Sequence, residues 1–176
     1  TWTVVDWCDD SYSTSYIQTI MVKDTVPPVI SCPTNTLYYN VTGPLSPTGS
    51  YCYADLRGIP LPTVISDNCA PNNTIQFTVS MVDNVTAAAF SGAQLASVPK
   101  GNYTVTYSAI DRCGNISHCT RQVVVRDTEG PNVVCIQNTV ASVSWDGTVR
   151  VFASSFDNGT LDNCTARDQL IFKVRR

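Results

Sequence analysis

Histidine, charged residues and long apolar runs are scarce in this chain, and each scarcity argues against a class of function. The 176 residues include one histidine, and 14% are charged. A Ser-His-Asp or Cys-His catalytic pair would depend on His118 alone, which we place in the loop ISHC. A glycosidase that uses a pair of carboxylates is not excluded by the number of acidic residues, which is 14, but no motif points to one. We therefore expect no enzyme activity, no catalytic residues and no cofactor.

Membrane-spanning and nucleic-acid-binding features are also lacking. No window approaches the roughly 18 apolar residues that a membrane span needs. The opening TWTVVDWC has neither the basic nor the apolar part of a signal peptide. The net charge is -3, with no Lys/Arg cluster beyond the terminal KVRR. We expect no membrane span in this segment, no nucleic-acid partner, and an origin inside a longer secreted protein.

Cysteine, by contrast, is abundant, with eight residues and no CxxC pair. Beside a single histidine, this pattern favours disulfides over a zinc site or thiol redox chemistry. It predicts an extracellular or cell-surface location. The cysteines predicted to form disulfides are Cys8, Cys32, Cys52, Cys69, Cys113, Cys119, Cys135 and Cys164.

Three sequence motifs occur twice. VKDTVPPVISC (22–32) returns as VRDTEGPNVVC (125–135), TWTVVDWC (1–8) as TYSAIDRC (106–113), and SDNCAP (66–71) as LDNCTA (161–166). The repeat is roughly a hundred residues, about one immunoglobulin-like sandwich. We predict that 1–26 is the C-terminal part of a first module, 27–128 a complete module and 129–176 the N-terminal part of a third.

Alternating apolar residues predict strands within the complete module. In TIQFTVSMV (74–82) and YTVTYSA (103–109) every second residue is apolar, as in half-buried antiparallel strands. RQVVVRD (121–127) is predicted to be the last strand, and VISC (29–32) the first. No segment combines caps with a helical period, so we expect almost no helix. The predicted fold class is all-β, made of tandem immunoglobulin-like antiparallel sandwiches stapled by disulfides.

The motifs DTVPPVISCP, GSYCYADLRGIPLPTVISDNCAP, YTVTYSAIDRCGN and FDNGTLDNC resemble hyalin-repeat (HYR) and HYR-like immunoglobulin-fold modules of large surface proteins. The resemblance covers nearly the whole chain. The second copy of the first motif, residues 125–135, departs from the family by having Glu-Gly-Pro where Pro-Pro is usual, and the third module lacks a counterpart of Cys52. The resemblance implies spacers, adhesive surfaces or filament subunits, without catalytic residues.

Comparing the repeats suggests how the cysteines pair. The third module keeps Cys135 but has no counterpart of Cys52, and the first has no counterpart of Cys119. We predict Cys32–Cys52 within a module, Cys69–Cys113 between two turns, and Cys119–Cys135 across the boundary between the second and third modules. Cys8 and Cys164 would pair outside this segment. A Cys113–Cys119 bridge across a hairpin is the alternative.

N-glycosylation sequons are more frequent than chance, which would give about two or three. One interpretation is a glycan coat on a secreted protein. The other is a β-protein rich in Asn and Thr that carries no glycans. Asn163, beside a cysteine in a tight turn, should be the least accessible. The seven sequons begin at Asn40, Asn72, Asn84, Asn102, Asn115, Asn158 and Asn163.

Aspartates recur at matching positions in the repeats. Calcium bound between modules would need six to eight oxygens from such groups. Asp also caps its own turn, and in the absence of a dense D-x-D run we favour capping and predict no metal site. The recurring residues are Asp6 and Asp111, Asp24 and Asp127, and Asp67 and Asp162.

Two functions remain. The favoured one is a structural repeat segment of a large, N-glycosylated surface protein that forms a rod, filament or adhesin stalk, with other modules and like subunits as partners. The alternative is a carbohydrate- or protein-binding module of a receptor or secreted enzyme. Exposed aromatics would discriminate them: a single open cluster would favour binding, and burial between modules would favour assembly. The aromatics concerned are Tyr38, Tyr39, Tyr51 and Tyr53, with Trp2, Trp7 and Trp145 as a second candidate platform; Trp2 is predicted first as a core residue.

Overall fold

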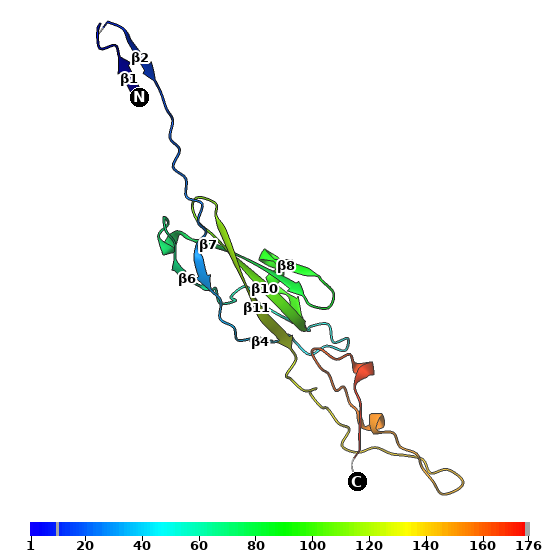
Figure 1. Ribbon diagram of the computed structural model, residues 1–176. Coiled ribbons are helices and arrows are strands. Elements are labelled where there is room, and N and C mark those ends of the chain that lie inside the picture. The colour runs from blue at the N-terminus through cyan, green and yellow to red at the C-terminus, as the bar shows by residue number, and fades with distance from the viewer. Residues whose placement is uncertain (10, 175–176) are drawn as a thin grey trace.

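The computed structural model describes residues 1–9 and 11–174 and shows an elongated, mostly β-stranded molecule (Figure 1). An N-terminal hairpin, residues 2–16, leads into a connecting segment without strands, residues 17–28. The central β-unit, residues 29–126, follows, and then a C-terminal segment, residues 127–174. The N-terminal hairpin and the C-terminal segment lie at opposite ends of the molecule (Figure 1).

The central β-unit contains one large sheet and two small ones. Its large sheet has the order β4-β11-β10-β7-β8, in which β4 runs parallel to β11 and the other neighbours are antiparallel. The pairs β3–β6 and β5–β9 are separate antiparallel ribbons, which gives a sandwich-like arrangement. The strands are β1 Trp2–Val5, β2 Ser13–Tyr16, β3 Val29–Ser31, β4 Leu37–Asn40, β5 Tyr53–Ala54, β6 Thr63–Ser66, β7 Gln76–Asp83, β8 Ala89–Ser91, β9 Val98–Pro99, β10 Gly101–Ile110 and β11 Ile116–Arg126.

The core lies on one face of the large sheet. Along β10, Tyr103, Val105, Tyr107 and Ala109 are buried, as a strand with alternating apolar residues predicts. Residues of β5, β9 and the loops close the other side, among them the fully buried Leu56. The predicted strands around 74–82 and 103–109 are therefore confirmed.

Helical structure is limited to short 3-10 turns within the described residues, which confirms the expectation of almost no helix. In that part of the chain, no helix is long and apolar enough to cross a membrane. The turns are η1 Asn72–Thr74, η2 Gly92–Ala96, η3 Ala153–Phe156 and η4 Arg167–Gln169.

The predicted module boundaries stay a prediction. The last strand of the large sheet ends at Arg126, close to the predicted limit at 128. Three isolated bridges, Ser46–Asp162, Asn132–Leu161 and Cys135–Asp157, take the place of regular strands in the C-terminal segment. The last two residues of the predicted third module, 175 and 176, lie outside the described residues.

The disulfides differ from the predicted pairs. The structure joins Cys32 to Cys119, with Cα atoms 5.9 Å apart, and Cys52 to Cys164, with Cα atoms 4.6 Å apart. The predicted Cys32–Cys52 and Cys119–Cys135 bridges and the alternative Cys113–Cys119 bridge are therefore wrong. The prediction that Cys164 pairs outside the segment is also wrong.

The reason for these corrections is the strand arrangement. Cys32 follows β3, which lies beside β11, and β11 carries Cys119. The loop around Cys52 instead faces the turn that holds Cys164, since the Tyr51 N–H donates to the Asn163 carbonyl. The remaining cysteines are exposed and unpaired in the structure, so the predicted Cys69–Cys113 clamp is not formed: Cys8, Cys69, Cys113 and Cys135.

The contacts between loop 46–52 of the central β-unit and residues 161–167 form what we call the second joint. The Ser46 N–H donates to the Asp162 carbonyl at 3.0 Å, and the Arg167 N–H donates to the Pro47 carbonyl at 2.9 Å. A Cβ on Gly49, whose φ is +62°, would lie 2.7 Å from the Cys164 carbonyl oxygen. Glycine at this position therefore permits the close approach.

Candidate functional site

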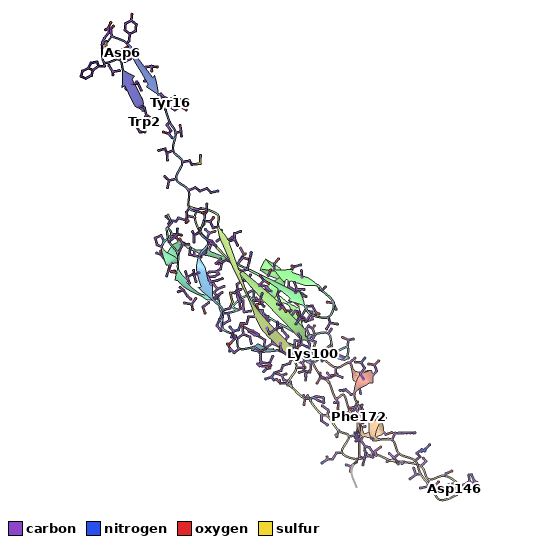
Figure 2. The ribbon with its side chains drawn as sticks, in the orientation of Figure 1. Trp2, Asp6, Tyr16, Lys100, Asp146 and Phe172 are labelled. Atoms are coloured by element: carbon purple, nitrogen blue, oxygen red, sulfur yellow. A yellow bond between two sulfur atoms is a disulfide. The ribbon has the colours of Figure 1, made fainter. Side chains whose placement is uncertain are left out.

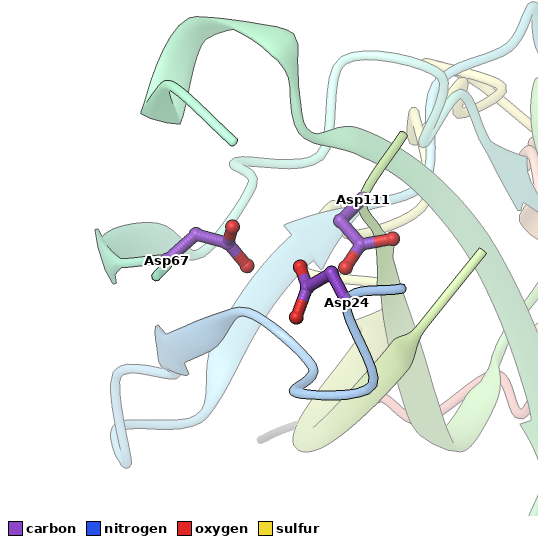
Figure 3. Close-up of side chains that lie close together, drawn as sticks. All are labelled: Asp24, Asp67 and Asp111. Atoms are coloured by element: carbon purple, nitrogen blue, oxygen red, sulfur yellow. The ribbon is translucent and has the colours of Figure 1, made fainter. Parts of the chain in front are cut away.

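The candidate site is a cluster of three aspartates where the connecting segment meets the central β-unit, which we call the first joint. Asp24 comes from the connecting segment, Asp67 from the turn after β6, and Asp111 from the turn between β10 and β11. One carboxylate oxygen of each lies within 4.8 Å of the others. Figure 3 shows the three carboxylates turned toward one another from these separate stretches of chain.

Each aspartate uses one oxygen, Oδ1, to cap its own turn. Asp24 Oδ1 accepts from the Val26 N–H at 3.0 Å, and Asp67 Oδ1 accepts from the Cys69 N–H at 3.0 Å. Asp111 Oδ1 accepts from the Cys113 and Asn115 N–H groups, both at 2.8 Å. The predicted capping role is thus confirmed for all three. Because these local bonds fix each side chain, the second oxygen has a set direction.

Two of the second oxygens have no partner. Asp24 Oδ2 and Asp67 Oδ2 each expose less than 1 Å² to solvent and accept no hydrogen bond. Asp111 is buried as a whole residue, with 6% of its surface exposed. Among the described residues, none of these carboxylates forms an ion pair with a Lys or Arg side chain. A buried anionic oxygen without a partner is unfavourable, so the cluster is electrostatically incomplete.

Asn115 connects the cluster to the backbone of the connecting segment. Its Nδ2 donates to Asp111 Oδ2 at 2.7 Å and to the carbonyls of Asp24 and Val26 at 3.3 and 3.4 Å. Burial by itself raises the pKa of Asp111, but hydrogen bonds from the Asn115 side chain and from neighbouring backbone N–H groups outweigh it and hold the pKa below its usual value. Asp111 is therefore held in its charged form.

The ligands that the cluster offers are all oxygen atoms, which suit a hard cation rather than zinc or copper. The sequence identified the three residues but favoured capping as their whole role. What it missed is that the fold gathers them: Asp24 and Asp111 are far apart in the chain. Their recurrence in the repeats was the available signal.

The other recurring aspartates cap turns without joining the cluster. Asp6 Oδ1 accepts from the Cys8 N–H, and Asp127 Oδ1 from the Glu129 N–H. Asp162 Oδ1 accepts from the Cys164 N–H at 2.8 Å, in the same geometry as Asp67, but this residue is buried in the second joint.

The predicted sequons differ in access. Asn163 is 1% exposed, and neither of its side-chain polar atoms has a hydrogen-bond partner, in line with its predicted low accessibility. Asn115 is half-buried, and its Nδ2, the atom to which a glycan would attach, is bonded in the first joint. The remaining five are exposed: Asn40, Asn72, Asn84, Asn102 and Asn158. Occupancy stays a prediction.

The predicted aromatic platforms do not form. Trp2 is 66% exposed, against its prediction as a core residue, and Trp145 is 99% exposed. The N-terminal hairpin, which carries Trp2 and Trp7, lies at the opposite end of the molecule from Asp146, the neighbour of Trp145 (Figure 2). A single sugar-stacking surface of the three is thereby excluded.

The tyrosines are divided between different surroundings. Tyr38 is exposed, with the Arg126 guanidinium 4.8 Å from its ring centre, while Tyr39 packs against the core. The Tyr51 and Tyr53 rings lie 6.5 Å apart, and the Tyr51 backbone takes part in the second joint. The four tyrosines do not make one open face.

His118 lies on β11 and not in a loop, so its predicted placement is wrong. Its Nδ1 is 2.8 Å from the Ser108 hydroxyl on β10, because the strand register sets the two residues opposite each other. The pair is exposed, and no carboxylate in the described residues hydrogen-bonds to His118. The arrangement has the serine and the base of a catalytic triad without the group that orients the base.

Comparison of the chain with family models, curated proteins and solved structures finds no match.

Proposed function

We propose that this chain is a rod segment of a secreted, N-glycosylated surface protein, built from consecutive immunoglobulin-like modules of the HYR-like kind. The observation that carries the proposal is the second joint. There, the repeated DNC turn of the C-terminal segment docks on loop 46–52 and is bonded through Cys52–Cys164. A repeated turn that attaches to the preceding unit is the contact needed to extend a chain of modules end to end.

Three further features support the proposal. The molecule is elongated, with its ends far apart (Figure 1). Its disulfides suit an oxidising compartment outside the cytosol. Most sequons lie on exposed surface, where glycans would coat the rod without disturbing the core. The alternative, a carbohydrate- or protein-binding module, has weaker support because the aromatic residues are dispersed.

Electron microscopy of native surface material labelled with an antibody to the central β-unit tests this function. For a rod, the label recurs along fibres, and non-reducing gels followed by peptide mapping recover the Cys52–Cys164 peptide. The rod would be rejected if the fibres carry no label and the labelled protein is found instead as monodisperse particles that bind a glycan array. That result would favour the binding module. The glycan coat is checked separately by the mass lost on enzymatic removal of N-glycans.

A further inference from the structure

The two unpartnered oxygens of the first joint require an explanation that turn capping does not give. In each turn Oδ1 already accepts the backbone N–H bonds, so Oδ2 of Asp24 and of Asp67 adds nothing to the cap. Both Oδ2 atoms are nevertheless buried, and Asp24 and Asp67 each have a carboxylate oxygen within 4.8 Å of one on Asp111. Burying two such oxygens beside a third carboxylate is costly unless a cation lies between them.

We propose that Asp24, Asp67 and Asp111 bind a calcium ion that fastens the connecting segment to the central β-unit. Two oxygens that share a Ca²⁺ ion at its usual bond lengths can be up to about 5 Å apart, and the three oxygens here lie within 4.8 Å. Oxygens bound to Mg²⁺ can be only about 4 Å apart at most, so the cluster as it stands suits calcium better.

Further oxygens are close at hand for the higher coordination number of calcium. The carbonyls of Asp24 and Val26 both accept from Asn115 Nδ2, the same nitrogen that donates to Asp111 Oδ2. They therefore border the cluster, and water would complete the six to eight ligands. Little reorganisation is needed, since the Oδ1 caps already hold the three side chains in place.

The ligands come from two parts of the chain, which gives the ion a mechanical role. Asp24 belongs to the connecting segment, whereas Asp67 and Asp111 belong to the central β-unit. Bound calcium would thus couple the direction of the connecting segment to the sheet, and its removal would free that segment. The inference is independent of the proposed function, because a rod can be jointed without calcium and a binding module can contain it.

Calorimetric titration of the chelator-treated whole chain with CaCl₂ tests the site. We expect one calcium per chain, with a dissociation constant of about 10⁻⁴ to 10⁻³ M, the range of extracellular modules. Magnesium should bind at least about tenfold more weakly. Asp67→Asn and Asp24→Asn keep the capping oxygen while removing the charge, and each should lower calcium affinity at least about tenfold.

Asp127→Asn is the matched control. Asp127 is the repeat counterpart of Asp24 and caps a turn through Glu129, but it lies outside the cluster. Its substitution should leave calcium affinity unchanged. No heat and no rise in melting temperature with the folded wild type, or equal loss of affinity in Asp127→Asn and Asp67→Asn, would overturn the proposal.

Hydrogen exchange gives a second readout that does not depend on the fold surviving mutation. In the wild type, calcium should slow amide exchange in the peptide around residues 22–28 and leave the C-terminal segment unaffected. Equal slowing across the whole chain would indicate nonspecific binding and would also count against the site.

Discussion

Both joints of this molecule contain a DNC turn, residues 67–69 in the first and 162–164 in the second, but they are held by different means. At the second joint, loop 46–52 and residues 161–167 share backbone hydrogen bonds and the Cys52–Cys164 disulfide. At the first joint, the connecting segment has no strand and no disulfide, and it touches the central β-unit through Asp24 and the Asn115 side chain. One joint is covalent and the other is polar.

The two DNC turns show which features are set by local sequence and which by tertiary contacts. Asp67 and Asp162 make the same bonds to the N–H groups two and three residues on. Cys69 is nonetheless exposed, whereas Cys164 is bonded and its neighbour Asn163 is buried. The shape of the turn follows from its own sequence, but docking depends on what lies opposite it.

The largest effect should come from removing the covalent link of the second joint. In Cys52→Ser/Cys164→Ser, loss of a bridge that spans 112 residues should cost about 5 kcal/mol of unfolding free energy in the chain-entropy model. The C-terminal segment should also lose protection from amide exchange. Urea unfolding and exchange mass spectrometry measure the two effects.

The matched comparison is Cys32→Ser/Cys119→Ser, which opens the bridge inside the central β-unit. It should lower the unfolding free energy by a similar amount, because it spans 87 residues. Its exchange pattern should differ, with protection lost in the central β-unit and not in the C-terminal segment alone. Identical patterns would mean that the second joint is not a separate element.

Gly49→Ala should produce the next largest loss of stability, at the second joint. The new Cβ would meet the Cys164 and Ala166 backbone, and alanine would also have to adopt the left-handed φ of +62°, for a total of about 2 kcal/mol. Gly92→Ala is the control, since its φ is +53° but nothing lies within 4 Å. Equal changes in the urea midpoint would show that backbone strain alone is responsible.

Acid should loosen the second joint through Asp157. Hydrogen bonds from Thr160 and then the Arg167 guanidinium lower the pKa of Asp157 to about 2. A lowered pKa stabilises the fold above the ordinary aspartate value, and this stabilisation is lost as the pH falls from about 4 toward 2. Asp157→Asn should flatten this part of the profile of urea midpoint against pH. Asp168→Asn, an exposed neighbour on η4, should leave the profile unchanged.

Asn115→Ala should have the smallest effect and act on the first joint. It removes the donor to the Asp24 and Val26 carbonyls and to Asp111 Oδ2, for a loss of about 1.5 kcal/mol. Amide exchange of residues 22–28 should accelerate in calcium-free buffer. Asn102→Ala removes an exposed sequon without touching the joint and should leave that exchange as it is. If exchange is unchanged in Asn115→Ala, Asp24 alone holds the connecting segment at the first joint.

The strands could be predicted because their signal is local. Every second residue of β10 is buried, and that alternation is written in YTVTYSA. The turn caps could be predicted for the same reason, because each Asp and the N–H groups that it accepts from lie within a few residues of one another.

The disulfides and the cluster could not be predicted, because both depend on contacts distant in sequence. Cys32 and Cys119 are 87 residues apart, and their pairing requires β3 to lie beside β11. Comparing repeats placed bridges inside modules and missed that Cys164 returns to Cys52. The aspartates were identified by recurrence, but that recurrence does not tell which of them meet.

The order of the large sheet has a consequence for how such molecules crowd together. Its two longest strands, β10 and β11, are interior, and its edges are the four-residue β4 and the three-residue β8. An unpaired strand edge invites another chain to add to the sheet, and short edges give that addition little to hold. Asn40, at the end of β4, is an exposed sequon, so a glycan there would shield one edge further. The short edges thus oppose the fusion of two molecules into one continuous sheet.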